Sequence, residues 1–198
     1  TDELDPIDYD TLLSTKSRIK VVATRADDGR PHYFSNSDFQ KNNSEVLKAS
    51  CALPMVCSPV EIKGKLYYDG GVSDPLPVQK ALDDGCDRLV VILTKPLDFV
   101  MGREITSPLH PYLLKKYPAV VKALDKRGVR YRRGIRLLRK LEKEGRAVII
   151  APSQKQKITT ATKDVETLKS FYRLGYDDAM QKLGEIKKKN THKTQAAV

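Results

Sequence analysis

The stretch Leu89-Val-Val-Ile-Leu-Thr94 carries the strongest signal for the fold of this 198-residue chain. It is a continuous apolar run of strand length and does not alternate between apolar and polar residues. Such a strand is typically buried on both faces, as in a parallel sheet that helices cover. A second run of this kind is Arg146-Ala-Val-Ile-Ile150. The two runs predict an α/β fold with a mostly parallel central sheet flanked by helices.

Helical patterns lie around these two runs. Pro75 suits the first turn of a helix and Gly85 suits its end, which predicts a helix over 75–84. Apolar residues recur with the helical period over 108–124 and again over 129–143, which predicts two further helices. The alternation of helices with buried strands supports the α/β class.

The end of the chain has a different composition. Asp164 is placed to cap a last helix, whose apolar residues repeat every three to four positions. Residues 187–198 begin with three lysines and are interpreted as a basic tail. The folded domain is therefore expected to span residues 1–186.

The first half of the chain predicts short strands joined by tight turns. Residues 18–25 and 32–35 flank the turn dipeptide Asp28-Gly29, which is typical of a hairpin. Residues 60–68 alternate on either side of Lys63-Gly64 and predict a second hairpin. Between them, 44–50 reads as a short helix.

Charge is distributed unevenly along the chain. The formal net charge is +11, yet residues 1–100 hold 12 basic and 16 acidic side chains, whereas residues 101–198 hold 24 and 9. Hydrophobic residues make up 40% of the chain, and no apolar run reaches the roughly 20 residues of a membrane-spanning helix. We therefore expect a globular protein with a basic second half, located in the cytoplasm or peripherally on a membrane.

The cysteines and histidines form no recognisable site. The three cysteines, Cys51, Cys57 and Cys86, make no disulfide framework and are expected to be small core residues. The three histidines, His32, His110 and His192, lie in no motif, and we expect surface roles for them. The chain contains no H-E-x-x-H, Cys/His cluster or EF-hand spacing. No metal and no cofactor is therefore expected.

Asp69 is the strongest candidate for chemistry. It stands where the second hairpin ends and the pair Gly70-Gly71 begins, so the sheet would fix its carboxylate while the backbone turns. A fixed carboxylate of this kind suits a general base. The alternative is a turn aspartate that caps the helix starting near Pro75, and the tripeptide alone favours that alternative.

The surroundings of Asp69 resemble the patatin-like phospholipase family in both order and spacing. The matching features are Ala49-Ser-Cys-Ala-Leu-Pro54, then the hairpin over 60–68, then Asp69-Gly-Gly-Val-Ser-Asp-Pro75. Asp74-Pro75 departs mildly from the Asn-Pro that is frequent in the family. The resemblance is clear over 18–94 and weaker from Val148 to the last helix.

This resemblance implies a three-layer hydrolase fold and a Ser-Asp dyad in which Asp69 is the base and Gly70 and Gly71 form the supporting turn. The substrate would be a lipid or another ester. The family's nucleophile lies in G-x-S-x-G, which this chain lacks, and Ser73 is no substitute because it follows the aspartate and precedes Asp74-Pro75. We therefore expect the chain to be the C-terminal portion of such a domain, inactive alone and prone to self-association.

The basic helix over 126–146 offers an alternative function. Its basic residues are Arg127, Arg130, Arg132, Arg133, Arg136, Arg139, Lys140 and Lys143. They could hold an anionic membrane or nucleic acid in a non-catalytic binding module, although no motif predicts specific nucleic-acid binding. A plain solvated helix face is an equally good interpretation. For Tyr67 and Tyr68, beside Asp69, packing is favoured over lining an acyl pocket.

Overall fold

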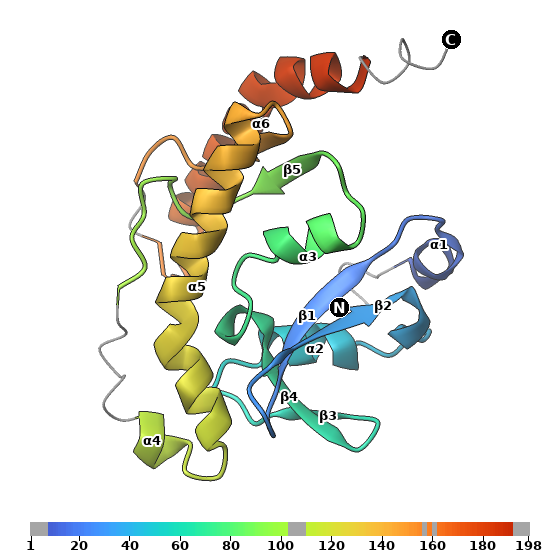
Figure 1. Cartoon of the computed structure of the whole chain (residues 1–198), viewed down its shortest axis with the longest axis vertical. Coiled ribbons are helices and arrows are strands. Elements are labelled where there is room, and N and C mark those ends of the chain that lie inside the picture. The colour runs from blue at the N-terminus through green and yellow to red at the C-terminus, as the bar shows by residue number, and fades with distance from the viewer. Residues whose placement is uncertain (1–7, 103–109, 156–157, 160–161, 192–198) are drawn as a thin grey trace. The chain divides into compact units, whose positions relative to one another are not determined.

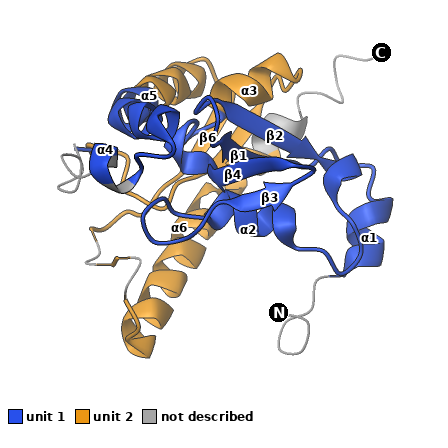
Figure 2. Cartoon of the chain, turned by 90° about the horizontal axis from the view of Figure 1, so that it is seen from below, with its two compact units in different colours: residues 1–77, 101–132 blue, residues 78–100, 133–198 orange. Residues whose placement is uncertain are grey.

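The computed structural model describes residues 8–102, 110–155, 158–159 and 162–191. The chain divides into two compact units, which Figure 2 distinguishes by colour. Unit 1 comprises residues 1–77 and 101–132, and unit 2 comprises residues 78–100 and 133–198. Both units combine helices with strands, which confirms the predicted α/β class.

Unit 1 is built from short elements, labelled in Figure 1. They are α1 (Tyr9–Ser14), β1 (Lys20–Arg25), β2 (Pro31–Ser35), η1 (Asn36–Asp38), α2 (Glu45–Cys51), β3 (Val60–Ile62), β4 (Lys65–Asp69), η2 (Gly70–Val72), α4 (His110–Leu113) and the first part of α5 (Pro118–Lys143). Both predicted hairpins and the short helix between them are confirmed. The turn between β3 and β4 places Lys63 and Gly64 at φ values of 51° and 72°, so a glycine suits its second position.

The strands of unit 1 form one antiparallel sheet in the order β2-β1-β4-β3. The prediction of a mostly parallel sheet is therefore wrong for the described residues, in which parallel pairing joins only β5 (Leu89–Ile92) to β6 (Ala147–Ile150). The physical reason lies in the connections. A tight turn can join only antiparallel strands, whereas parallel strands need a long crossover.

The sheet of unit 1 buries apolar side chains on both faces. On one face Tyr67 and Phe34 pack with Val46 of α2. On the other face Tyr68 packs with Val72 and with residues from the first turns of α5, including Val120. Tyr67 and Tyr68 point to opposite faces because side chains alternate along a strand. Both are buried, as the packing interpretation predicts.

Unit 2 contains α3 (Val78–Asp83), β5, the second part of α5, β6 and α6 (Val165–Thr191). All four residues of β6 are buried. Burial of both strand faces is wrong for β5, however, because Val90 is 52% exposed and Ile92 is 73% exposed. Among the described strands β5 pairs with β6 alone, and the described part of the chain leaves this face of β5 uncovered.

The long helix α5 corrects the prediction of two helices over 108–124 and 129–143. It runs without interruption from Pro118 to Lys143 and includes Gly128. A Cβ on Gly128 would lie 3.1 Å from the carbonyl oxygen of Met101, so this glycine permits a close approach and does not end the helix. Residues 103–109 lie outside the described part, and α4 covers residues 110–113.

The last helix is longer than predicted. It continues to Thr191, so the first five residues assigned to the tail are helical. Residues 192–198, which include His192, lie outside the described residues.

The three cysteines are exposed, so the prediction that they fill the core is wrong. Cys51 is the last residue of α2, and Cys57 and Cys86 lie in connecting segments, where side chains face water more often than in a sheet. Within the described ranges, no helix combines the length and apolarity needed to cross a bilayer. The same ranges contain no cluster of three His, Cys, Asp or Glu side chains suited to a metal ion.

Candidate active-site turn

The backbone of Asp69 is held from two sides. It is the last residue of β4, where it pairs with Ala23 of β1. Its N–H donates a hydrogen bond to the carbonyl oxygen of Ala52, 2.9 Å away. The segment from Asp69 to Asp74, which we call the β4 turn, therefore starts from a fixed point in the sheet.

The carboxylate of Asp69 is half-buried and caps η2. Its Oδ1 accepts a hydrogen bond from the N–H of Gly71 at 2.6 Å. Within the described part of the chain, no donor forms a hydrogen bond to Oδ2 of the same carboxylate. The alternative interpretation expected Asp69 to cap the helix that starts near Pro75; instead it caps η2, and this cap occupies only one of the two carboxylate oxygens.

Burial and charge act on this carboxylate in opposite directions. Burial raises the pKa of Asp69 above the ordinary value of 3.8. The Gly71 N–H and the positive charge of Arg127, which comes from α5, partly offset that rise in the pKa. Arg127 lies close, because its Nη2 would be 3.6 Å from a Cβ placed on Gly71. The carboxylate is therefore partly shielded from water and lies near a cation.

Close packing explains why both residues of the β4 turn that follow Asp69 are glycines. A Cβ on Gly70 would lie 2.2 Å from the carbonyl oxygen of Val22, which no residue with a side chain can tolerate. A Cβ on Gly71 would lie 3.0 Å from Oδ1 of Asp69. The local packing therefore favours glycine at both positions, and the supporting role predicted for Gly70 and Gly71 stays a prediction.

A buried hydroxyl network lies beneath the β4 turn. The hydroxyl of Thr24 donates to the carbonyl oxygen of Asp69 at 2.7 Å and accepts from the N–H of Ser73 at 3.2 Å. Because the single Thr24 hydroxyl proton is used in this way, the Ser73 hydroxyl, 2.8 Å away, must be the donor to Thr24. Ser73 is only 2% exposed, which agrees with its rejection as a nucleophile. Sequence reasoning missed Thr24, since it lies 45 residues before Asp69.

The end of the β4 turn is tied to β2. The hydroxyl of Tyr33 donates to Oδ2 of Asp74 at 2.5 Å. Asp74 stands where the patatin-like family frequently has asparagine. Here its carboxylate accepts the hydrogen bond from Tyr33. Sequence reasoning gave no role to Tyr33.

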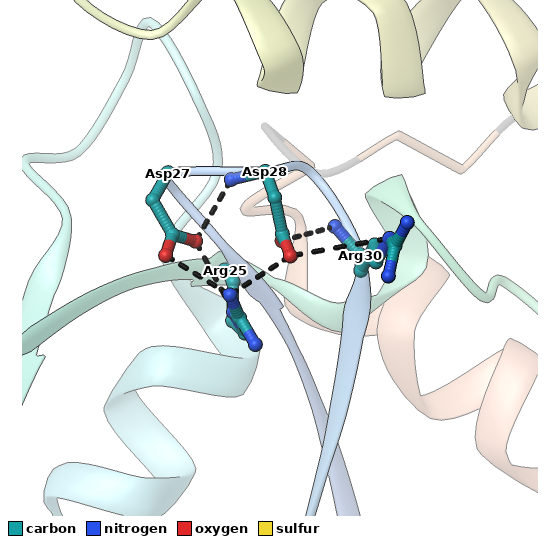
Figure 3. A network of polar contacts seen from close by, with 4 residues as sticks. All are labelled: Arg25, Asp27, Asp28 and Arg30. Carbon is teal, nitrogen blue, oxygen red and sulfur yellow. Dashed lines mark hydrogen bonds and ion pairs between the residues drawn. The ribbon is translucent and has the colours of Figure 1, made fainter.

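A second turn with the same dipeptide joins β1 to β2, and Figure 3 shows its polar contacts. Arg25 bonds both oxygens of Asp27 and lies 2.8 Å from Asp28. Hydrogen bonding to Arg25 lowers the pKa of Asp27, whose side chain is 62% exposed. This turn, residues 25–30, is a surface ion-pair cluster and offers no sheltered carboxylate.

Of the three histidines, His32 takes a different position from the one expected. The ring of His32 is half-buried and packs 4.6 Å from the ring of Phe34 and 5.4 Å from that of Tyr67, measured between centroids. Burial lowers the pKa of His32. A surface role is therefore wrong for this residue, because β2 turns it onto the aromatic cluster. His110 begins α4, and no described contact brings a histidine to Asp69.

The basic residues of the predicted helix 126–146 do not all share one environment. The helix itself ends at Lys143. Arg127 is half-buried near Asp69, and Arg130 donates from Nη1 to the carbonyl oxygen of Ala123 at 3.1 Å. Arg132, Arg133, Arg136, Arg139, Lys140 and Lys143 are exposed.

Unit 2 contains a cavity of about 540 Å³ near the carboxyl ends of β5 and β6. Its lining includes Thr94, Lys95, Pro152 and Phe171. Lys95 is the one charged side chain among the lining residues, and Asp69 is not among them. The cavity therefore lacks the pair of groups that ester hydrolysis requires.

Comparison with known proteins separates two parts of the chain. The family model for patatin-like phospholipases matches residues 7–82, which confirms the resemblance over this range. A different family model, described as a domain of unknown function (DUF6363), matches residues 117–189. The uncharacterized protein YjjU of Escherichia coli (strain K12) is 38% identical over 95 residues, which is 46% of this chain. The chain spans about a quarter of the length of that relative, since the match covers 26% of it.

Proposed function

Since residues 7–82 are of the patatin-like phospholipase family, we propose that this chain supplies the base of a Ser-Asp dyad in a lipid acyl hydrolase. Asp69 is the base, and the nucleophilic serine lies outside the 198 residues. The substrate is a phospholipid or another carboxylic ester. The observation that carries the proposal is the half-buried carboxylate of Asp69, whose Oδ1 accepts from the Gly71 N–H while no described donor bonds to Oδ2.

The chemistry needs four proton transfers at this carboxylate, two in acylation and two in hydrolysis of the acyl-serine. Asp69 takes the proton of the serine hydroxyl while the serine oxygen attacks the ester carbonyl. The proton then passes to the leaving alcohol as the carbon–oxygen bond breaks, leaving an acyl-serine. Water attacks the acyl-serine in the same way, releases the carboxylic acid and restores the serine. No histidine is required.

The electrostatics of the β4 turn support this role. A base must be ionised before the reaction and must hold a proton briefly during it. The Arg127 charge and the Gly71 N–H favour the ionised form of Asp69, whereas burial raises its pKa toward the range that suits a proton acceptor.

The same proposal includes the fold: residues 1–186 are part of a three-layer patatin-like domain.

The test compares this chain with a version extended upstream so that it includes a G-x-S-x-G segment. We expect the extended protein to hydrolyse a short-chain nitrophenyl ester and the 198-residue chain to have no serine-dependent activity. Asp69→Asn in the extended protein is expected to lower kcat by about a thousandfold, as loss of a general base does. Asparagine retains an oxygen that can accept from Gly71, so the turn is expected to fold.

Asp27→Asn is the matched control, because it removes a carboxylate from the other Asp-Gly turn of the same unit. It is expected to leave kcat unchanged. Full activity in the Asp69→Asn variant, or serine-dependent hydrolysis by the 198-residue chain, contradicts the proposal.

A second candidate function rests on the exposed basic residues of α5. In this alternative the protein is a non-catalytic module that binds an anionic membrane or nucleic acid, and the extended protein has no esterase activity. Self-association is a separate proposal, supported by the exposed side chains of Val90 and Ile92 on β5. Light scattering of a concentrated sample tests it, and a strictly monomeric species contradicts it.

A further inference from the structure

Every exposed side chain of α5 between residues 133 and 143 is a cation. These five residues, which we call the cationic row, are Arg133, Arg136, Arg139, Lys140 and Lys143. The buried residues of the same segment are Ile135, Leu138 and Leu141. With a rise of 1.5 Å per residue, the row extends for about 15 Å along the helix. The segment thus presents one purely basic face to solvent.

Few acidic groups neutralise the cationic row. Lys140 lies 3.9 Å from Glu144, at the end of the row, and Asp98 interacts electrostatically with Arg139 although it forms its ion pair with Lys155 at 3.0 Å. In the described part of the chain, no acidic side chain forms an ion pair with Arg133, Arg136 or Lys143. Glu142 is half-buried and acts on Lys182 of α6 instead. The row therefore keeps most of its positive charge for a partner.

Exposed apolar side chains belong to a segment that is tied to the row. Arg139 donates from Nη2 to the carbonyl oxygen of Leu97 at 3.2 Å. Shortly after Leu97 come Phe99, which is 36% exposed, and Val100, which is 70% exposed. A turn fixes the backbone that leads to these two residues, because the N–H of Phe99 donates to the carbonyl oxygen of Pro96. All of these residues belong to unit 2.

We propose that the cationic row, together with Phe99 and Val100, binds the surface of a bilayer that contains anionic phospholipid. Clusters of four to eight basic residues on a helix attract anionic lipid head groups. The apolar pair can enter the boundary between head groups and acyl chains, which is a contact that nucleic acid does not offer. This inference goes beyond the proposed hydrolysis, because it involves no residue of the β4 turn.

The test is flotation of the 198-residue protein with vesicles of phosphatidylcholine alone or with about 30% phosphatidylserine. We expect binding only to the anionic vesicles, weakening as salt increases. The triple variant Arg133→Glu, Arg136→Glu and Lys143→Glu is expected to lower the partition coefficient by about a hundredfold or more. It leaves the Arg139 tether and the Lys140 ion pair in place.

The matched control reverses three exposed lysines of unit 1, Lys16, Lys20 and Lys48, and thus changes the net charge equally. This control is expected to retain most of the binding. Arg133→Lys with Arg136→Lys is also expected to retain it, because a charged surface does not require the guanidinium geometry. Val100→Ser is expected to weaken vesicle binding several-fold.

Three results would overturn the inference. The first is an absence of flotation with anionic vesicles, and the second is equal loss of binding in the unit 1 control. The third is tighter binding to a labelled DNA duplex or single-stranded RNA than to the vesicles at the same salt, which would assign the row to nucleic acid. Circular dichroism of each variant verifies that α5 remains folded.

Discussion

Two turns of unit 1 begin with the same dipeptide and differ in what surrounds the carboxylate. Asp28-Gly29 lies in the turn after β1, whereas Asp69 is the last residue of β4 and Gly70 follows it. Both glycines are closed off by backbone: a Cβ would lie 2.4 Å from the carbonyl oxygen of Ala119 at Gly29 and 2.2 Å from that of Val22 at Gly70. Both turns therefore require a glycine for close packing, and Gly29 is also favoured by its φ of 67°.

The carboxylates of the two turns differ in exposure and in partners. In the first turn Arg25 engages both Asp27 and Asp28 at the surface. In the β4 turn the carboxylate of Asp69 is half-buried and takes one backbone hydrogen bond. A dipeptide can thus dictate a turn, whereas packing around the turn determines how far its carboxylate is buried and which partners it takes.

The largest expected loss of stability comes from replacing the two closely packed glycines. Gly70→Ala and Gly29→Ala are each expected to lower the free energy of unfolding by about 3 kcal/mol, because the new methyl group collides with backbone. Urea denaturation measures the effect. Gly64→Ala is the control for Gly29→Ala, since both glycines have a positive φ but a Cβ on Gly64 meets no atom within 4 Å, and about 1 kcal/mol is expected there. Equal losses in all three variants would contradict the close-approach explanation.

The next largest loss of stability is expected at Thr24, whose hydroxyl bonds residues of the β4 turn. Thr24→Val removes the hydroxyl that bridges Asp69 and Ser73, leaves their buried groups without it, and is expected to cost about 2 kcal/mol. Thr24→Ser keeps the hydroxyl and is expected to recover much of that loss. If serine and valine destabilise the protein equally in urea, the methyl group and not the network supports the β4 turn.

The smallest effect is a difference in pH dependence. The pKa of Asp27 is lowered on folding, so its stabilising contribution is present above pH 3.8 and is lost as the pH falls through the folded value. The pKa of Asp69 is raised on folding, so its contribution is present below pH 3.8 and is lost as the pH rises through the folded value.

Stability measured from about pH 2 to pH 7 tests this difference. Wild type should lose its advantage over Asp27→Asn toward acid, and its stability relative to Asp69→Asn should decline toward neutral pH. Slopes of the same sign would show that burial does not dominate at Asp69.

The sequence predicted local structure better than it predicted pairing. Both hairpins follow from Asp28-Gly29 and Lys63-Gly64, because turn chemistry acts within a few residues. The run at 89–94 predicts a strand correctly but not its exposed face, since burial depends on neighbouring elements that the run does not specify. The predicted break between the helices over 108–124 and 129–143 is wrong for the same reason, since the close approach of Met101 that explains Gly128 is a tertiary contact.

The features of the candidate site also divide into those that the sequence predicts and those that depend on packing. The sequence by itself determined that Asp69 ends a strand, that two glycines follow it, and that the order of motifs over residues 49–77 is patatin-like. Only the tertiary structure decided that Arg127 lies near its carboxylate, that Thr24 bonds its carbonyl oxygen, and that the carboxylate is half-buried. Residues far apart in the chain meet through packing, and the energies of burial and charge that set a pKa exist only after they have met.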